Sequence, residues 1–305
     1  MKSPLRRLGL PLYERLLERG LSGAPDHVAV IQDGNRRYAR ERGKDTSEGH
    51  REGADTTEQL LHWCDDLDVG EVTLYTFSTE NFDRPADQRE YIFDLVESKL
   101  REFADADRVH EGEVRIRAIG ELEMLPERVL DAIEYADERT AGYDQLQLNI
   151  ALAYGGRAEL LGAARDIAAD VESGTLDPDA IDVDTIESRL YEGPTQDVDL
   201  IIRSGGVERT SNFLPWHANG NEAAVYFCAP YWPAFRKVDF LRAIRTYEHR
   251  AASWRTNRAR RALSLVTSLG AGNAGEARRT LSRFQEALPS GEQDAVEEEI
   301  ESASD

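Results

Sequence analysis

Four short polar segments of this sequence each follow an apolar run and share an unusual set of side chains. They combine glycine, arginine, small hydroxyl residues and a few acids, at residues 32–37, 78–84, 155–157 and 204–212. Glycine lets backbone N–H groups approach an anion closely, and the arginine fork binds phosphate oxygens with paired hydrogen bonds. Acids among arginines are typical of a divalent cation that bridges to phosphate. These residue types therefore predict a phosphate-binding site that uses a divalent cation.

The elements that must position these segments can be inferred from the apolar runs. Such runs occur at residues 27–31, 72–77, 114–119, 146–154, 198–203 and 223–227, and they alternate with helical patterns. This alternation is typical of parallel βαβ units. We predict a single α/β domain with a central, mostly parallel six-stranded sheet flanked by helices. Because the carboxyl ends of parallel strands lie at one edge of a sheet, the polar segments should converge in one cleft.

Several other classes of site and protein are excluded by the motifs. No Walker lysine motif is present, and no G-x-G-x-x-G follows a strand, so neither common type of nucleotide site is supported. Cys64 and Cys228 show no paired spacing, which predicts two buried thiols in a reducing cytoplasm. No apolar run approaches the ~18 residues of a membrane span, and the charged N-terminus is unlike a signal peptide. The expected protein is cytoplasmic, in peripheral contact with a membrane at most.

The charge balance is strongly acidic. The 305 residues carry 58 acidic and 37 basic side chains, a formal net charge of −21, and only four of the basic residues are lysines. A broad acidic surface repels phosphate backbones, so binding to a nucleic acid duplex is not expected. At ~1 M salt the Debye length falls to ~3 Å, so dense surface acid costs little there. The composition therefore predicts a halophilic protein.

Three parts of the chain are predicted. Residues 1–24 form an amphipathic lead-in with a short helix at 5–20, residues 25–288 form the catalytic domain, and residues 289–305 form an acidic, solvated tail. Within the domain, residues 171–197 read as a loop, a short helix and another loop, and residues 237–287 read as helical.

Five motifs, in order, resemble those of the cis-prenyltransferases, the undecaprenyl and dehydrodolichyl diphosphate synthase family. They are HVAVIQDGNRRYA at 27–39 with EGH at 48–50, FSTENF at 77–82, NIALAYGGR at 149–157, IIRSGG-x-x-R-x-SNFLPW at 201–216, and Glu222. The resemblance covers roughly residues 25–248. Arg36-Arg37-Tyr38 is similar to the archaeal and eukaryotic branch, and the composition favours a haloarchaeal member.

The resemblance implies an activity and partners. Members of this family use Mg²⁺ and add isopentenyl diphosphate units in cis to an allylic diphosphate, and the growing chain occupies a hydrophobic tunnel. The implied primer is farnesyl or geranylgeranyl diphosphate, and the implied product is a polyprenyl diphosphate, the precursor of a lipid carrier for glycosylation. A homodimer and peripheral membrane contact for product release are also implied.

Carried over position by position, the resemblance implies roles for individual residues. Asp33 corresponds to the essential acid and, with Glu222, to the metal ligands. Asn81 matches the residue assigned as proton acceptor in relatives, although a neutral amide is a poor base, and a diphosphate oxygen or water is chemically better suited. The substrate-binding set is Gly34, Asn35, Arg36, Arg37, Tyr38, His50, Ser78, Thr79, Glu80, Phe82, Arg84, Arg203, Arg209, Thr210 and Ser211.

One departure from the family pattern affects a phosphate contact. Many relatives carry an arginine where this chain has Thr46. We expect Arg36 or Arg42 to compensate for the missing guanidinium.

Two alternatives compete with a polyprenyl synthase. The first is a non-catalytic partner subunit of a heteromeric cis-prenyltransferase. Retention of the acid and arginine motifs argues against it: Asp33, Arg37, Arg203, Arg209 and Glu222. A phosphosugar-binding domain on a similar sheet would leave the SNFLPW segment unexplained.

Overall fold

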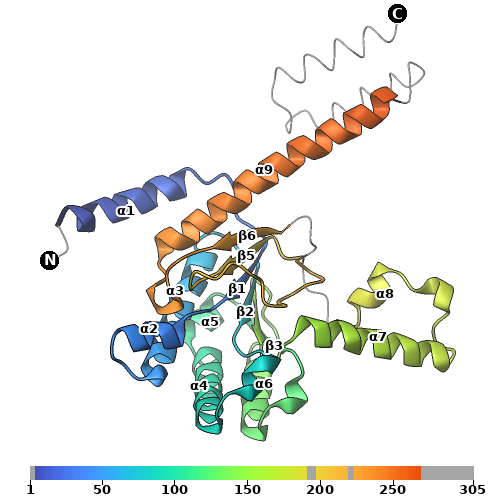
Figure 1. The fold of residues 1–305 in the computed structure, drawn as a ribbon, viewed down its shortest axis with the longest axis horizontal. Helices are drawn as coiled ribbons and strands as arrows, with labels where there is room; N and C mark the ends of the chain where they lie inside the picture. Colours follow the sequence, from blue (N-terminus) through green and yellow to red (C-terminus); the bar gives the residue numbers. More distant parts are fainter. Residues whose placement is uncertain (1–3, 191–196, 219–222, 269–305) are drawn as a thin grey trace, which may run out of the picture. The chain divides into compact units, whose positions relative to one another are not determined.

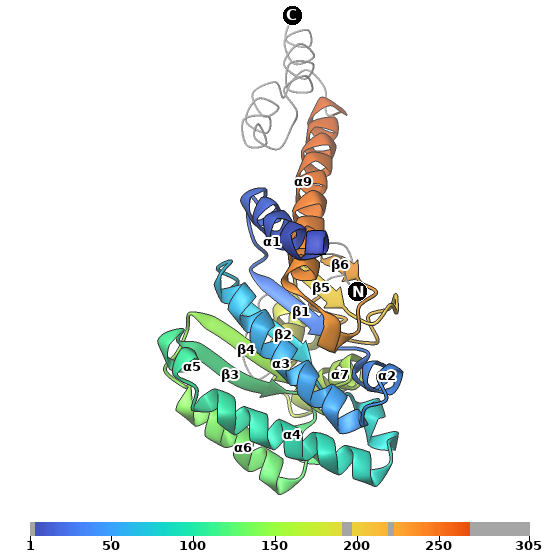
Figure 2. The ribbon, with the colours of Figure 1, turned by 90° about the vertical axis from the view of Figure 1, so that its left-hand side faces the viewer.

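The described strands form one parallel sheet, as predicted. The structure is a computed structural model and describes residues 4–190, 197–218 and 223–268. The strands are β1 (His27–Ile31), β2 (Glu71–Tyr75), β3 (Val114–Ile119), β4 (Leu146–Ala151), β5 (Leu200–Arg203) and β6 (Ala224–Phe227). All neighbours pair in parallel, in the order β3-β4-β2-β1-β5-β6. Figure 1 shows the fold, and Figure 2 labels each of these strands. The prediction of six strands is confirmed.

The register aligns the carboxyl ends of the central strands. Ile31 of β1 lies opposite Tyr75 of β2 and Arg203 of β5. The apolar run predicted at 72–77 is longer than the strand, which ends at Tyr75. Beyond Tyr75 the regular pairing stops, because the N–H groups of Thr76 and Phe77 both donate to the Ala151 carbonyl. The polar segments that follow β1, β2 and β5 therefore begin at one level of the sheet.

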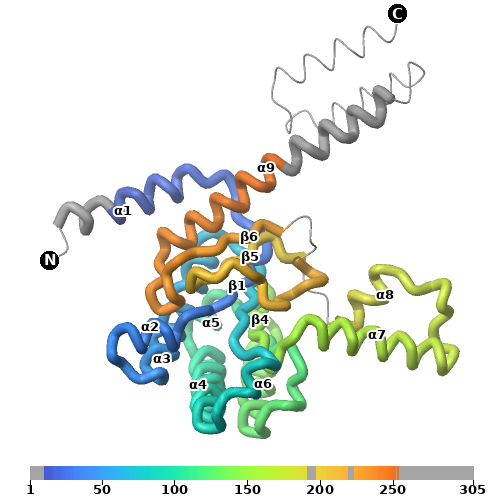
Figure 3. Tube along the Cα trace, viewed as in Figure 1, coloured from blue at the N-terminus to red at the C-terminus, as the bar shows by residue number. Residues whose placement is uncertain are grey.

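Helices connect the strands and cover the sheet. They are α1 (Pro4–Arg19), α2 (Asn35–Glu41), α3 (Thr46–Asp65), α4 (Ala86–Ala104), α5 (Asp107–Glu111), α6 (Glu127–Arg139), α7 (Gly156–Glu172), α8 (Val183–Glu187) and α9 (Lys237–Ser268). The 3₁₀ turns are η1 (Thr79–Asp83), η2 (Leu122–Met124), η3 (Pro178–Ala180) and η4 (Trp232–Ala234). Helices α3, α4 and α6 lie along one face of the sheet (Figure 2). The trace in Figure 3 follows the chain from β1 into α2 and α3.

The opposite face of the sheet packs against the segment after β5. Ala29, Ile31 and Ile201 form a buried cluster there with Phe213 and Leu214. Every residue of β1 is buried, as expected for a central strand covered on both faces. This packing fixes the loop that follows β5 close to the loop that follows β1.

Helix α1 lies within the stretch predicted to form the amphipathic lead-in. Its Leu17 packs against Val238 and Leu241 at the start of α9, whereas Leu12 and Leu16 remain exposed. The described residues up to Ile244 belong to one compact unit, and those from Arg245 belong to a second. No helix among the described residues is long and apolar enough to cross a membrane. The predicted tail at 289–305 lies outside the described residues.

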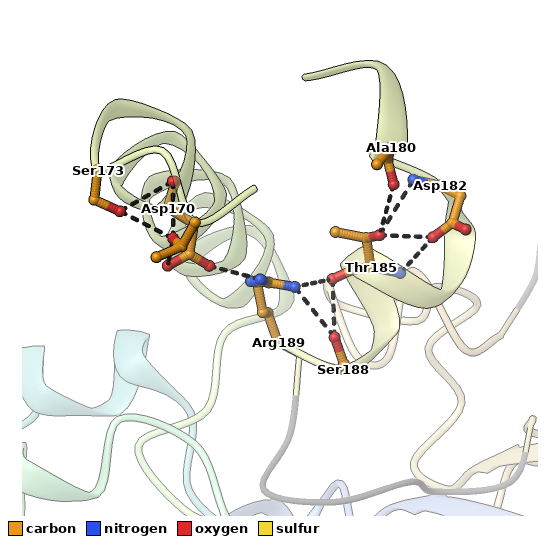
Figure 4. A network of polar contacts seen from close by, with 8 residues as sticks. Asp170, Ser173, Ala180, Asp182, Thr185, Ser188 and Arg189 are labelled. Carbon is orange, nitrogen blue, oxygen red and sulfur yellow. Dashed lines mark hydrogen bonds and ion pairs between the residues drawn. The ribbon is translucent and has the colours of Figure 1, made fainter. Parts of the chain in front are cut away.

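A short hairpin of helices follows β4, in the region predicted to hold a loop and a short helix. Arg189 links its two arms: Nη2 donates to Asp170 Oδ2 of α7 at 2.6 Å, and Nη1 donates to the Thr185 carbonyl of α8 at 2.7 Å (Figure 4). The Asp182 carboxylate accepts from the backbone N–H of Thr185, which caps α8. These contacts hold α8 against the end of α7.

Candidate active site

Asp33, directly after β1, is the residue at which two arginine clusters meet. Its Oδ1 accepts from Arg37 Nη2 at 2.9 Å, and its Oδ2 accepts from Arg203 Nη2 at 2.8 Å. Arg37 comes from α2, and Arg203 ends β5. One carboxylate therefore joins α2 to the end of β5, and Arg203 lies 170 residues after Asp33 in the sequence.

The backbone of Asp33 is held as firmly as its side chain. Its N–H donates to Ser204 Oγ at 3.0 Å, and its carbonyl accepts from Ser204 Oγ and from the N–H of Trp232. The two adjacent glycines have positive φ, 104° at Gly34 and 88° at Gly205. A Cβ on Gly205 would come within 2.7 Å of Arg37 Nη2, so a larger residue there would disturb the Asp33 ion pair.

The first cluster consists of Arg36, Arg37, Arg40 and Arg84. It lines a cavity of about 540 Å³ beside α2. Arg36, Arg40 and Arg84 line it, and in the described part of the chain none of the three lies within 4.0 Å of a carboxylate. Burial and the neighbouring Arg36 lower the pKa of Arg84 to about 10. Burial and the charges of Arg84 and Arg36 lower the pKa of His50 to about 4, so its ring is neutral at pH 7. Uncompensated positive charge of this kind favours an anion with several charges.

The second cluster consists of Arg203, Arg209 and Ser211, which hydrogen bonds join to one another. Arg203 has only 5% of its side chain exposed, and its Nη1 donates to the Arg209 carbonyl and to Ser211 Oγ. Its Nε is buried, and no described residue accepts a hydrogen bond from it. The side chain of Arg209 and the hydroxyl of Ser211 line the same cavity as Arg203. The Arg203 guanidinium is therefore held in one position at the wall of this cavity.

The loop after β2 contributes a third wall. Ser78, Glu80 and Asn81 line the cavity that contains Asp33 and Arg203. The Asn81 side chain is used locally, because its Oδ1 accepts from the Ser78 N–H at 3.3 Å. That bond caps η1 and leaves the amide NH₂ as the part of Asn81 that can donate to a ligand.

The cavity shared by these groups continues between α3 and α4. It measures about 360 Å³. Beyond the polar groups its walls are apolar and come from both helices and from the sheet beneath them: Ala54, Leu74, Ile92, Leu95, Val96, Leu100, Phe103 and Ile150. A polar mouth, lined by the second cluster and by Arg84 of the first, thus leads into an apolar channel.

Most of the predicted site residues line one of these two cavities. They are Asp33, Gly34, Asn35, Arg36, Arg37, His50, Ser78, Glu80, Asn81, Arg84, Arg203, Arg209 and Ser211. Four others serve the packing around the site and line neither cavity: Tyr38, Thr79, Phe82 and Thr210. Tyr38 donates to Glu52, and Phe82 packs edge-on against Phe77. Glu222 lies outside the described residues.

The fourth polar segment joins the site only through its backbone. The N–H of Gly156 donates to the Asn212 carbonyl, and Gly155 lies against Thr79. Arg157 is exposed and lines neither of the two cavities. This segment therefore supports the two loops beside it.

Arg40, which the sequence analysis did not single out, lines the cavity that contains Thr46. Arg36 and Arg40 share that cavity with Thr46, whereas the guanidinium of Arg42 lies over the Tyr38 ring at 3.7 Å. Arg42 is therefore engaged elsewhere, and Arg40 is available in its place. The spacing of Arg40 and Arg36, one helical turn apart, was the signal that could have identified it.

Comparison with known proteins decides the family. Residues 31–254 match the prenyltransferase family model described as "Putative undecaprenyl diphosphate synthase". The chain belongs to the cis-prenyltransferase family. Two haloarchaeal relatives of this prenyltransferase, from Haloarcula marismortui and Halobacterium salinarum, are 69% and 65% identical to it over 99% of its length and all of theirs. Both are named tritrans,polycis-undecaprenyl-diphosphate synthase (geranylgeranyl-diphosphate specific).

A solved structure shares the fold of this prenyltransferase. The lavandulyl diphosphate synthase of Lavandula x intermedia, in complex with dimethylallyl diphosphate, is 34% identical, with a TM-score of 0.69. The similarity covers 73% of this chain and 95% of that one. The α/β sheet architecture is therefore that of the family.

Proposed function

We propose that this prenyltransferase elongates geranylgeranyl diphosphate with isopentenyl diphosphate in cis to an undecaprenyl diphosphate. The observation that carries the proposal is that two neighbouring cavities, each lined by one arginine cluster, share Asp33, and that the cavity of Arg203 continues into an apolar channel. The two clusters match two diphosphates, and the channel matches a growing hydrocarbon chain. The printed names of the haloarchaeal relatives favour geranylgeranyl over farnesyl diphosphate as the primer.

The reaction divides between the two clusters. The allylic carbon–oxygen bond breaks, a carbon–carbon bond forms to isopentenyl diphosphate, and the latter loses a proton. Arg36, Arg40 and Arg84 bind the diphosphate that departs, since none of the three forms an ion pair with a carboxylate among the described residues. Arg203, Arg209 and Ser211 hold isopentenyl diphosphate. Electrostatic stabilisation of the departing diphosphate lowers the barrier most, because charge develops there.

The proton passes to an oxygen of the departing diphosphate or to water. Asn81 orients the acceptor, because its NH₂ can donate while its carbonyl oxygen is held by the Ser78 N–H. Neutral His50 adds a hydrogen-bonding group beside Arg84 without adding charge.

A magnesium ion fits the residues present. The described residues contain no group of three or more metal-ligating side chains, so a site made by protein alone is not available there. Magnesium instead uses one or two carboxylates together with phosphate oxygens and water. The Asp33 carboxylate, 28% exposed and lining both cavities, is suited to that role, and Glu222 is the second ligand proposed from the family motif. When bound, the ion would neutralise negative charge on the allylic diphosphate.

We also propose a cytoplasmic homodimer in peripheral contact with the membrane. β6 is the edge strand of the sheet and exposes Val225, so its free edge can pair with a second copy. The exposed Leu12 and Leu16 of α1 provide an apolar surface for lipid contact. Sedimentation in molar salt should show a species of twice the chain mass, and a 34 kDa species alone would contradict the dimer.

Incorporation of radiolabelled isopentenyl diphosphate tests the activity. The purified protein with magnesium and geranylgeranyl diphosphate should give a ladder of apolar products, and farnesyl diphosphate should be the poorer primer. Absence of incorporation by the protein alone, restored by a second subunit, would support the partner-subunit alternative. Binding of a sugar phosphate without incorporation would support the phosphosugar-binding alternative.

A further inference from the structure

The apolar channel contains one charged side chain that the reaction does not use. Helix α4 lines the channel with a stripe at helical spacing, from Ile92 through Val96 to Leu100 and Phe103, and Lys99 lies within that stripe. The helix begins two residues after Arg84 of the anion site. Since an α-helix rises ~1.5 Å per residue, Lys99 and Phe103 line the part of the channel farthest from the reacting groups.

Lys99 belongs to a group of ion pairs that joins three helices. Its Nζ lies 3.0 Å from Glu58 of α3 and 2.9 Å from Glu102 of α4. Glu58 also pairs with Arg108 of α5 at 3.3 Å, and the Arg108 guanidinium lies over the Phe103 ring. We call Lys99, Glu58, Glu102 and Arg108 the Lys99 cluster. Of its four members Lys99 lines the channel, and the other three hold Lys99 in place from α3, α4 and α5.

The Lys99–Glu58 pair at the centre of this cluster is partly withdrawn from water and still charged. The side chains of Lys99 and Glu58 are 19% and 22% exposed. Although burial opposes it, hydrogen bonds from Lys99 and the charges of Lys99 and Arg108 hold the pKa of Glu58 below its ordinary value. Burial alone would lower the pKa of Lys99, but the hydrogen bonds and charges of Glu102 and Glu58 raise it above its ordinary value. Both members are therefore ionised at neutral pH.

We propose that the Lys99 cluster forms the end of the product channel and sets the chain length at which elongation stops. This inference rests on the proposed function. A growing polyprenyl chain gains free energy while it covers apolar walls. To extend further it must cover paired charges with hydrocarbon or separate them, and both are unfavourable. The balance of these effects stops elongation when the chain reaches Lys99.

The test is the product ladder of variants that remove the charges in pairs. Lys99→Met with Glu58→Gln keeps side-chain length and leaves neither of these two partners unpaired. Labelled isopentenyl diphosphate and geranylgeranyl diphosphate would be supplied, and chain length read by reverse-phase chromatography. The maximum of the ladder should shift upward by at least one five-carbon unit, whereas Lys99→Arg should keep the wild-type ladder.

A matched control removes a charge from the same helix outside the channel. Arg101 of α4 lines neither cavity, and its side chain is 42% exposed. Arg101→Met should keep the wild-type product length. A shift as large as that of the double variant would show that helix stability controls length, which would overturn the proposal.

The remaining outcomes separate the inference from the proposed function. A wild-type protein that incorporates no isopentenyl diphosphate would refute the function itself. An active double variant with an unchanged product ladder would refute the role of the Lys99 cluster in setting chain length and leave the proposed function standing. If the double variant does not fold, Lys99→Ala provides the same test, because it removes the ammonium from the channel wall, and an unchanged ladder would be equally contradictory.

Discussion

The two anion clusters differ in how far their arginines are committed before substrate binds. Arg36 and Arg40 are exposed and have no carboxylate partner in the described chain, whereas Arg203 is buried and donates to three acceptors. In each cycle the diphosphate at the first cluster departs, while that of isopentenyl diphosphate stays on the product. An open cluster suits an ion that must leave, and a connected cluster suits an ion that must be held in register. Asp33 bonds to both sides.

Loss of charge at Asp33 should have the largest effect. Asp33→Asn keeps a hydrogen-bond acceptor for Arg203 but removes the charge that would hold magnesium. Turnover should fall about 10³-fold, or ~4 kcal/mol of transition-state stabilisation, while the KM for geranylgeranyl diphosphate changes little. Steady-state kinetics measure both. The exposed Asp83, in η1 and outside both cavities, provides the control Asp83→Asn, and near-normal turnover in Asp33→Asn would refute the role.

Removing an uncommitted arginine should weaken allylic binding. Arg40→Ala should raise the KM for geranylgeranyl diphosphate about 10- to 100-fold, because a charge-assisted hydrogen bond contributes ~1.5–3 kcal/mol. The KM for isopentenyl diphosphate should stay the same. Thr46→Arg, which places a guanidinium in the same cavity, should restore part of the loss. Equal weakening of both substrates would contradict the assignment of Arg40 to the first cluster.

In the second cluster, the side chain of Arg209 should matter less than its backbone. Its carbonyl holds Arg203, and Arg209→Ala preserves that contact. The KM for isopentenyl diphosphate should rise about tenfold through loss of one exposed charged donor. Kinetics with geranylgeranyl diphosphate held at saturation measure this rise. A larger rise in the KM for geranylgeranyl diphosphate than in the KM for isopentenyl diphosphate would contradict the assignment of Arg209 to the second cluster.

The smallest effect concerns pH. The folded pKa of His50 is about 4, below its ordinary 6.5, so the unfolded chain binds a proton more readily. The free energy of unfolding should therefore fall as pH decreases from about 6.5 to 4. His50→Gln should reduce that fall, most visibly between pH 6.5 and 5, in urea titrations at constant salt. An identical pH dependence in both proteins would show that His50 is not held neutral.

The sheet and the convergence of the loops could be predicted, but the roles of several motif residues could not. Apolar runs specify parallel strands, and parallel strands place Asp33, Ser78 and Arg203 at one edge whatever their side chains do. A motif does not distinguish residues that face a cavity from residues that hold the loop, so the family motifs include Tyr38 and Phe82, which line neither cavity, beside residues that do.

The residues missed by the sequence analysis have a different origin. Arg40 and Lys99 lie in ordinary helical sequence, and their positions depend on which face of α2 or α4 turns toward the cavities. Trp232 reaches the site through tertiary packing alone, since its indole N–H donates to the Gly53 carbonyl of α3. Such contacts are not encoded in local spacing.

The central claim is that Arg203 and Asp33 join two otherwise separate diphosphate sites. Arg203→Lys tests it most directly, because a lysine keeps the charge but cannot reach Asp33, the Arg209 carbonyl and Ser211 together. With each substrate varied separately, both KM values should rise by about tenfold or more. An increase confined to isopentenyl diphosphate, or no increase in either KM, would contradict the account.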